Sequence, residues 1–289
     1  MKSILIQFDS DEHPSVFDRV VAVDSGVEHL FSYGSITPDH VTALTHGAMF
    51  TRGPSELKNT AIFVGGSDVS RGEAVLRKIQ KAFFGPMRVS VMMDSNGCNT
   101  TAAAAIASAR KHLALKGTRA AVLGATGPVG LRAAELLALE GTEVTLVSRA
   151  IDRAMQACET VSGKVSGAQV TALSARDAAA TEAICHGHQL VVAAGAAGVT
   201  FLSEGALSRI SGLKIAIDLN AVPPLGIADI SVSDKAADKS GVLCFGALGV
   251  GGLKMKVHRQ AIASLFESND RILETRAIYD LALKVAGLM

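Results

Sequence analysis

The most informative stretch of the sequence is Ala120-Ala-Val-Leu-Gly124-Ala-Thr-Gly127-Pro-Val-Gly130, which joins an apolar run to a segment of helical periodicity, Leu131–Glu140. The pattern predicts a buried strand, a tight turn and a helix in direct succession. Small residues let such a turn pass close to a ligand, and the N–H groups at the start of the helix can bind a pyrophosphate. The spacing is GxxGxxG, and glycine-rich turns also occur without a ligand. The turn therefore predicts a dinucleotide site, which needs support from other residues.

Apolar runs of strand length alternate with helical segments on both sides of this turn, as in a parallel α/β sheet. In the second half of the chain, strands are predicted at Arg119–Leu123, Glu143–Val147, Gln169–Leu173, Leu190–Ala194, Lys214–Asp218 and Val242–Phe245. In the first third, strands are predicted at Ile4–Phe8, Val20–Asp24, Ala61–Gly65 and Arg88–Met93, and helices at Pro38–Gly47 and Val69–Phe84. Two helices are expected at the end, one reaching Leu265 and one at Asp270–Ala286.

An Ala-rich segment that starts at Thr101 has high helix propensity and is expected to connect two domains. The predicted fold class is α/β. We expect a smaller N-terminal α/β substrate domain over residues 1–100, joined by the C-terminal helix at 270–289. A Rossmann dinucleotide-binding domain is expected over residues 101–269, with a substrate cleft between the two domains.

The composition excludes several classes of protein. The 289 residues suit two medium domains, and the 48% of hydrophobic residues supply a full core. The formal net charge is only +1, so neither a nucleic acid nor a membrane is expected as a partner. No apolar run approaches the roughly 18 residues that span a bilayer, and the N-terminus is typical of a strand, not of a signal peptide. Four scattered cysteines show no CxxC spacing. We expect a cytoplasmic protein.

The end of the second predicted strand of the Rossmann domain indicates which dinucleotide binds. Ser148 and Arg149 stand where NAD-specific sites place Asp or Glu against the ribose 2′-hydroxyl, and Arg153 follows one helical turn later. Guanidinium groups bind a phosphate through paired hydrogen bonds and permanent charge. The residues predict NADP. The alternative is that both arginines belong to a solvated helix face.

Tiny residues after the fourth strand of this domain, Ala194 and Gly195, would let the nicotinamide ribose lie against the chain, although they also suit helix–sheet packing. Asn220 follows the fifth strand at the same sheet edge. The complete set of predicted cofactor-binding residues is Gly124, Ala125, Thr126, Gly127, Pro128, Val129, Ser148, Arg149, Arg153, Ala194, Gly195 and Asn220.

Polar residues gather at strand ends in the first domain, in the segments 9–18 and 94–101, although Asn99 or Thr100 would also serve as an ordinary helix N-cap. A glycine-rich stretch at 245–252 precedes a helix that carries Lys254, Lys256 and His258. Three such side chains after a glycine-rich loop indicate a substrate rim. The sequence has no zinc motif, no GxSxG elbow and no Cys/His pair placed for nucleophilic catalysis, so no covalent intermediate is indicated.

With these residues in view, the chain resembles the NADP-dependent methylene-tetrahydromethanopterin dehydrogenases of methylotrophic bacteria, a family that also accepts methylene-tetrahydrofolate in one branch. The resemblance runs nearly end to end. It is carried by Gln7-Phe-Asp9, Pro14-Ser-Val-Phe-Asp18, Ala61-Ile-Phe-Val-Gly-Gly66, Phe83-Phe-Gly-Pro86, Asp94-Ser-Asn-Gly97, Asn99-Thr-Thr-Ala-Ala-Ala104, Gly127-Pro-Val-Gly130, Asn220-Ala, Pro223-Pro-Leu-Gly-Ile227, Phe245-Gly-Ala-Leu-Gly249 and Gly251-Gly-Leu-Lys254. Gly124-Ala-Thr and His13 depart from the family pattern, and His13 leaves the preferred pterin open.

The resemblance implies reversible oxidation of a methylene bridge to a methenyl cation, with direct hydride transfer to NADP. It implies a pterin one-carbon carrier as the substrate, tetrahydromethanopterin or tetrahydrofolate, and a homo-oligomer, with a trimer as one form. The implied catalytic residues are Lys256, Asp18 and Asp94. The implied substrate-binding residues are Ser15, Phe17, Asn96, Asn99, Thr100, Lys254 and His258.

Two other functions fit parts of the sequence. A shikimate-type NADP dehydrogenase would share the domain order, but it needs a Lys/Asp acid–base pair that the sequence does not place. A non-catalytic NADP-sensing regulator would keep the turn at 124–130, and fold alone never proves catalysis. Such a sensor would have no need of a polar wall in the first domain.

Overall fold

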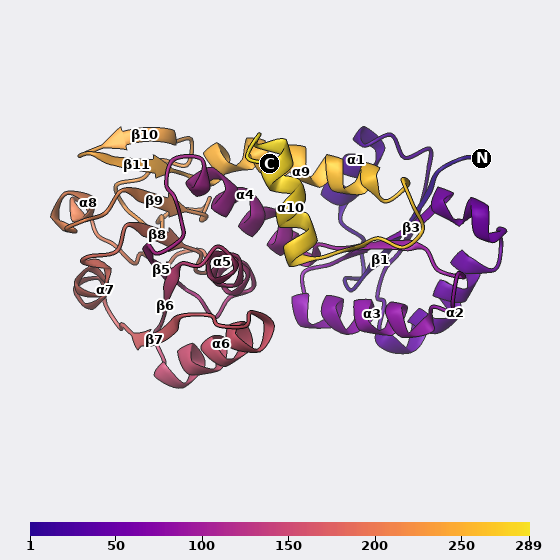
Figure 1. Cartoon of the computed structure of the whole chain (residues 1–289), viewed down its shortest axis with the longest axis horizontal. Helices are drawn as coiled ribbons and strands as arrows, with labels where there is room; N and C mark the ends of the chain where they lie inside the picture. The colour runs from indigo at the N-terminus through magenta and orange to yellow at the C-terminus, as the bar shows by residue number, and fades with distance from the viewer. The chain divides into compact units, whose positions relative to one another are not determined.

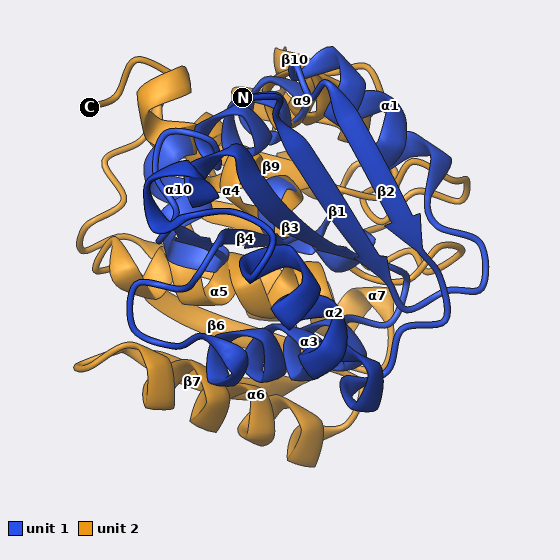
Figure 2. Ribbon diagram, turned by 90° about the vertical axis from the view of Figure 1, so that its right-hand side faces the viewer, with its two compact units in different colours: residues 1–100, 255–281 blue, residues 101–254, 282–289 orange.

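The computed structural model describes residues 1–289 and contains two compact units (Figure 2). Unit 1 comprises Met1–Thr100 and Met255–Leu281, and unit 2 comprises Thr101–Lys254 and Ala282–Met289. Residues 255–269, which the sequence prediction assigned to the Rossmann domain, therefore lie in unit 1. The physical reason is burial: the fully buried His258 ring contacts the rings of Phe17 and Phe63.

Unit 1 contains a five-stranded sheet of order β12-β4-β3-β1-β2, with every pair parallel, and Figure 2 shows β4, β3, β1 and β2 side by side in this order. Helices α2 and α3 lie side by side. The elements before residue 100 are β1 (Ile4–Asp9), α1 (Val16–Asp24), β2 (His29–Tyr33), α2 (Pro38–Met49), the 3₁₀ helix η1 (Pro54–Asn59), β3 (Thr60–Gly65), α3 (Val69–Ala82), β4 (Ser90–Met93) and the 3₁₀ turn η2 (Ser95–Gly97).

One predicted strand of unit 1 is wrong. Val20–Asp24 is the second half of helix α1, which begins after the N-cap Ser15, whose hydroxyl accepts a hydrogen bond from the Asp18 N–H. Val21 is buried while Val20 and Val23 are exposed, so one face of a helix packs and the other does not. The strand that pairs with β1 is β2, further along the chain.

Unit 2 contains a seven-stranded sheet of order β10-β11-β9-β8-β5-β6-β7. Helices α5 and α6 cover one face of this sheet, and α7 and α8 lie on the other (Figure 1). The elements are α4 (Cys98–Arg110), which starts in unit 1, then β5 (Arg119–Leu123), α5 (Pro128–Leu139), β6 (Glu143–Ser148), α6 (Ile151–Lys164), β7 (Val170–Ser174), α7 (Ala178–Cys185), β8 (Leu190–Ala193), α8 (Ala206–Arg209), β9 (Ile215–Asp218), β10 (Lys235–Lys239) and β11 (Val242–Phe245).

The parallel strands of unit 2 are those that the sequence predicted, within one or two residues at their ends. The chain winds outward from β5 in both directions, toward β7 on one side and toward β11 on the other. The strand order reverses between β5 and β8, and ligands of open α/β sheets bind beyond the carboxyl ends of the strands at such a point. The antiparallel edge strand β10 was not predicted, because Lys235-Ala-Ala-Asp-Lys239 lacks the apolar run of a buried strand.

The C-terminal part differs from the prediction at two points. Helix α9 (Ala247–Ser264) begins before the glycines at 249–252, so these residues form its first turns and not a loop. Gly246 and Gly249 lie against the backbone carbonyls of Ser231 and Asp234, where a Cβ would collide. A short strand, β12 (Ile272–Leu273), precedes α10 (Thr275–Val285). None of the helices combines the length and the apolar character required to cross a membrane.

Candidate functional site

The turn between β5 and α5 is closely packed. Gly124 has φ +73°, and a Cβ on it would lie 2.7 Å from the Gly195 Cα. A Cβ on Gly130 would lie 2.6 Å from the Gly124 carbonyl oxygen. Gly127 is the N-cap of α5 and supplies no side chain to the first N–H groups of the helix. The turn thus brings uncapped helix N–H groups to the carboxyl edge of the sheet, where they can bind an anion.

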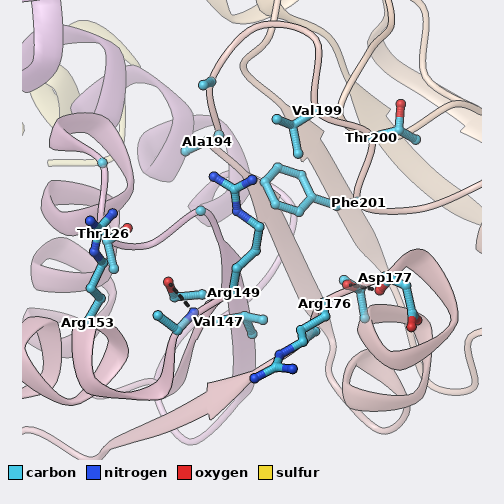
Figure 3. Close-up of a pocket in the computed structure, with 18 residues that line it drawn as sticks. Thr126, Val147, Arg149, Arg153, Arg176, Asp177, Ala194, Val199, Thr200 and Phe201 are labelled. Carbon is cyan, nitrogen blue, oxygen red and sulfur yellow. Dashed lines mark hydrogen bonds between the residues drawn. The ribbon is translucent and has the colours of Figure 1, made fainter.

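A cavity of about 270 Å³ opens beside this turn (Figure 3). It is lined by Gly124, Thr126, Gly127, Val147, Ser148, Arg149, Ala150, Arg153, Ala175, Arg176, Asp177, Thr181, Ala194, Gly195, Ala196, Val199, Thr200 and Phe201. All of these residues belong to unit 2. The cavity therefore brings together most of the residues that the sequence predicted to bind a dinucleotide.

Four of the predicted cofactor-binding residues do not line the cavity. Ala125 is fully buried under the turn, and Pro128 and Val129 form the first turn of α5. Asn220 lies after β9, where its own side chain closes a local turn. Its amide donates to the Pro224 carbonyl at 3.1 Å and its carbonyl accepts from the Val222 N–H at 3.0 Å.

Three arginines give the cavity a strong positive charge. Arg149 follows β6, Arg153 lies on α6 and Arg176 follows β7. No hydrogen bond or ion pair joins any of the three guanidinium groups to the protein. The only carboxylate in the lining belongs to Asp177, which caps α7 through the Ala180 N–H at 2.8 Å. Unpaired guanidinium groups around a glycine turn fit a dinucleotide that carries an additional phosphate.

The sequence prediction missed Arg176, Asp177 and Phe201. Arg176 follows its strand as Arg149 follows the neighbouring one, and the Ala175 N–H donates to the Ser148 carbonyl across these strand ends. This repeated strand-end arginine was a signal in the sequence. Phe201 carried no such signal, because its position depends on residues far away in the chain.

Gly195 is covered by the Phe201 ring. A Cβ on Gly195 would collide with the Cζ and Cε2 atoms of that ring. In the view of Figure 3, the ring is drawn beside the Arg149 guanidinium and below Val199. The surface that we expected to receive the nicotinamide ribose is thus an aromatic surface in this structure.

Asp218 orders the loop after β9. Its carboxylate is buried and accepts the N–H groups of Asn220 at 3.0 Å and Ile227 at 2.9 Å. Burial raises the pKa of Asp218, while the donated backbone hydrogen bonds oppose that rise. A Cβ on Gly226 would lie 2.8 Å from the same carboxylate, so the loop closes tightly over it.

In unit 1, the polar residues around Asp94 mostly contact each other. The Asp94 carboxylate accepts the N–H groups of Asn99 and Thr100 and, at 2.6 Å, the Thr100 hydroxyl. The His258 Nδ1 lies 4.0 Å from the same carboxylate. The Asn99 amide donates to the Met93 carbonyl and its oxygen accepts from the Thr275 hydroxyl. Asp94, Asn99 and Thr100 thus form one buried network at the start of α4.

The segment 9–18 forms a second polar group in unit 1. The buried Asp9 carboxylate accepts the Ser15 N–H at 3.0 Å, and Ser15 caps α1 through the Asp18 N–H at 3.2 Å. Phe17 is half exposed while its ring contacts His258 at a centroid distance of 6.2 Å.

The remaining predicted residues have varied settings. Asn96 sits in the 3₁₀ turn before α4 with φ +52°, a left-handed conformation that asparagine tolerates. Lys254 and Lys256 lie on α9, where Lys254 is half-buried and Lys256 is exposed. Lys254 belongs to unit 2 and Lys256 to unit 1.

Comparison with solved structures agrees with the fold. A quinate dehydrogenase from Corynebacterium glutamicum in complex with NAD has a TM-score of 0.54 at 12% identity, over 98% of this chain and 99% of that chain. A shikimate 5-dehydrogenase from Listeria monocytogenes has the same TM-score and identity, over 97% and 96% of the two chains. At such identities the likeness shows the two-unit Rossmann-like dehydrogenase fold and nothing about the substrate.

Comparison of sequences is more specific. Residues 16–96 match the family of the methylene-tetrahydromethanopterin dehydrogenase N-terminal domain. The chain is 47% identical to "Bifunctional protein MdtA" of Methylorubrum extorquens and 32% identical to an NAD(P)-dependent methylenetetrahydromethanopterin dehydrogenase of the same organism. Both alignments cover 99% of this chain and 99% of the relative. The chain therefore belongs to the methylene-tetrahydromethanopterin dehydrogenase family.

Proposed function

We propose that this protein is an NADP-dependent dehydrogenase that reversibly oxidises methylene-tetrahydromethanopterin, methylene-tetrahydrofolate or both to the methenyl form in one-carbon metabolism. Family membership supports the reaction, because the relative at 32% identity carries that activity and an NAD(P) requirement in its name. The observation that carries the choice of cofactor is the cavity with three guanidinium groups that form no ion pair with the protein.

The residues of unit 2 fit NADP. The uncapped start of α5 would bind the pyrophosphate, and Gly124 and Gly130 keep the turn compact enough for close approach. Arg149 and Arg153, with Ser148 at the end of β6, would bind the 2′-phosphate. When bound, the cofactor supplies the hydride-accepting carbon of its nicotinamide ring.

The chemistry demands little proton transfer from the protein. The carbon that loses hydride is flanked by two nitrogens whose lone pairs stabilise the resulting cation, so no general base is required. The contribution of the protein is then orientation and electrostatics. A role in orientation agrees with the network of Asp94, Asn99 and Thr100 in unit 1, whose side chains hold each other in place.

We assign roles in unit 1 on the same basis. Asp18 would anchor the pterin and stabilise the cationic product. Lys256 would bind a carbonyl of the substrate and orient it at a distance from the reacting carbon, because a positive charge beside the forming methenyl cation opposes the reaction. Asp94 would act at the start of α4, where it holds Thr100 and faces His258. The other proposed substrate contacts are Ser15, Phe17, Asn96, Asn99, Thr100, Lys254 and His258.

The test is the absorbance of the reduced nicotinamide. Purified protein is mixed with NADP or NAD and with either methylene-tetrahydromethanopterin or methylene-tetrahydrofolate. We expect reduction of NADP with at least one pterin and a much slower reaction with NAD. Tight NADP binding without any reduction would contradict the proposal and favour a sensor.

Two further parts of the proposal concern the protein in the cell. We infer a homo-oligomer, with a trimer as the first form to test, and a cytoplasmic location. Light scattering of the purified protein gives the molar mass that tests the first, and cell fractionation tests the second.

A further inference from the structure

The Phe201 ring combines contact with the core and contact with the cavity. It packs against the buried apolar cluster beneath β8 and β9 and also lines the cavity. The ring rests directly on Gly195, at a position where any other residue would collide with it. One glycine thus makes room for an aromatic surface at the edge of the sheet.

Hydrogen bonds hold the backbone that carries this ring. The Phe201 N–H donates to the Gly226 carbonyl at 2.8 Å, and the Thr200 hydroxyl donates to the Leu225 carbonyl at 3.0 Å. The Ile227 N–H in turn donates to the buried Asp218 carboxylate. Phe201 therefore sits on an ordered loop, and its ring is available at low entropic cost.

The lining of the cavity indicates which half of a dinucleotide meets this ring. Arg149 follows β6, Arg153 lies on α6 and Arg176 follows β7, whereas no residue of β9 or of the loop that holds Asn220 lines the cavity. In this fold the end of the second strand, here β6, binds the ribose 2′-position of the adenosine. Apolar walls at Val147, Ala175 and Val199 complete a surface suited to a planar base.

We propose that Phe201 is the adenine platform of the cofactor site, and that Gly195 serves to seat this platform and not to receive the nicotinamide ribose. The proposal rests on the proposed NADP dependence. Contact between an aromatic ring and adenine does not involve the 2′-phosphate, so Phe201 contributes equally to NADP and NAD binding. Arg149 supplies the discrimination between the two cofactors.

The absence of tryptophan from the sequence makes a direct test possible. Phe201→Trp introduces one reporter, and its fluorescence is followed during titration with adenosine 2′,5′-bisphosphate, 5′-AMP or nicotinamide mononucleotide. We expect both adenine nucleotides to change the emission and the nicotinamide nucleotide to leave it unchanged. Phe84→Trp is the control, since Phe84 is exposed in unit 1 and does not line the cavity.

Calorimetry on Phe201→Ala and Phe201→Leu gives the energetic test. From the usual strength of base–aromatic stacking, alanine is expected to raise the Kd of adenosine 2′,5′-bisphosphate roughly tenfold, with the same factor for 5′-AMP. Leucine keeps most of the apolar contact, is expected to give a smaller increase, and carries the test if the alanine variant does not fold.

Two results would overturn the platform: emission that responds only to nicotinamide mononucleotide, or an unchanged Kd in both variants. These titrations contain no pterin and no turnover. If the proposed dehydrogenase reaction is not observed, the titrations still test whether Phe201 contacts adenine. If Phe201 does not contact adenine, the proposed reaction is not contradicted.

Discussion

At the scale of single residues, the cavity gathers three arginines without pairing any of them to a carboxylate. Arg209 on α8 forms an ion pair with Glu182, and Arg110 on α4 lies 3.3 Å from Glu140. Arg149, Arg153 and Arg176 have no such partner although they share one cavity. Like charges gathered without an anion repel each other, and a bound phosphate would relieve that repulsion.

Replacement of Arg149 separates the two cofactors. Arg149→Ala is expected to lower kcat/KM with NADP by a factor that corresponds to about 1.5–3 kcal/mol, the contribution of a hydrogen bond to a charged group. The kcat/KM with NAD should stay nearly unchanged. Arg209→Ala is the control, because that arginine is exposed and lies outside the cavity. Equal losses with both cofactors would exclude a role at the 2′-phosphate.

Replacement of Asp18 tests unit 1. Asp18→Ala is expected to lower pterin turnover about tenfold or more while the Kd of NADP stays within about twofold, because the carboxylate would act on the pterin and not on the dinucleotide. Asp24→Ala lies on the same helix, is exposed at its end and should retain activity. A weakened NADP complex in the Asp18 variant would count against this assignment.

At the scale of elements, two glycines allow the cost of a left-handed backbone conformation to be measured apart from the cost of a Cβ collision. Gly117 and Gly124 both have φ +73°, but only at Gly124 would a Cβ meet another part of the backbone. An L-residue in this conformation costs about 1–2 kcal/mol by itself. The pair therefore offers a matched measurement of what the β5–α5 turn requires.

Gly124→Ala is expected to destabilise the protein by clearly more than Gly117→Ala and to abolish measurable NADP binding, because the turn must move away from Gly195. Thermal denaturation with and without NADP compares the two variants, since a bound cofactor raises the Tm. A Gly124 variant that is stabilised by NADP as well as Gly117→Ala would show that close packing of this turn is not needed for binding.

Elements also show where local pattern is insufficient. The run Val20-Val-Ala-Val23 reads as a strand because its residues are apolar and three are β-branched. The Ser15 cap and the one-sided burial of Val21 and Ala22 make it a helix instead. The central parallel strands of unit 2, β5, β6, β8 and β9, were predictable, because burial on both faces of a sheet leaves a continuous apolar run in the sequence.

At the scale of the whole molecule, one buried histidine links stability to pH. His188 is 2% exposed and its Nε2 lies 3.0 Å from the Thr145 hydroxyl. Burial lowers the pKa of His188 below its ordinary 6.5, the charge of Arg119 lowers it further, and nearby backbone carbonyls oppose the change. As the pH falls through 6.5, the unfolded chain gains a proton before the folded protein does, so this residue makes the folded state less stable.

His188→Gln should remove this pH dependence, since an amide can still bond to Thr145 but does not titrate. Urea denaturation at about pH 7.5 and about pH 5.5, on either side of the ordinary histidine pKa, should show a larger loss of unfolding free energy in the wild type. His29→Gln, at an exposed position of β2, should behave like the wild type. Parallel losses in wild type and His188→Gln would contradict the linkage.

The sequence was sufficient for the alternation of strands and helices, the glycine turn at 124–130 and the arginines after β6, because periodicity, glycine content and charge act over a few neighbouring residues. It could not reveal that Phe201 covers Gly195 or that residues 255–269 belong with unit 1, whereas the position of Arg176 after its strand was a signal that the prediction overlooked. The cover over Gly195 and the place of residues 255–269 each depend on segments that are distant in the chain and that meet through strand order and burial. Contacts of this kind form only when the sheets assemble, and no local pattern encodes them.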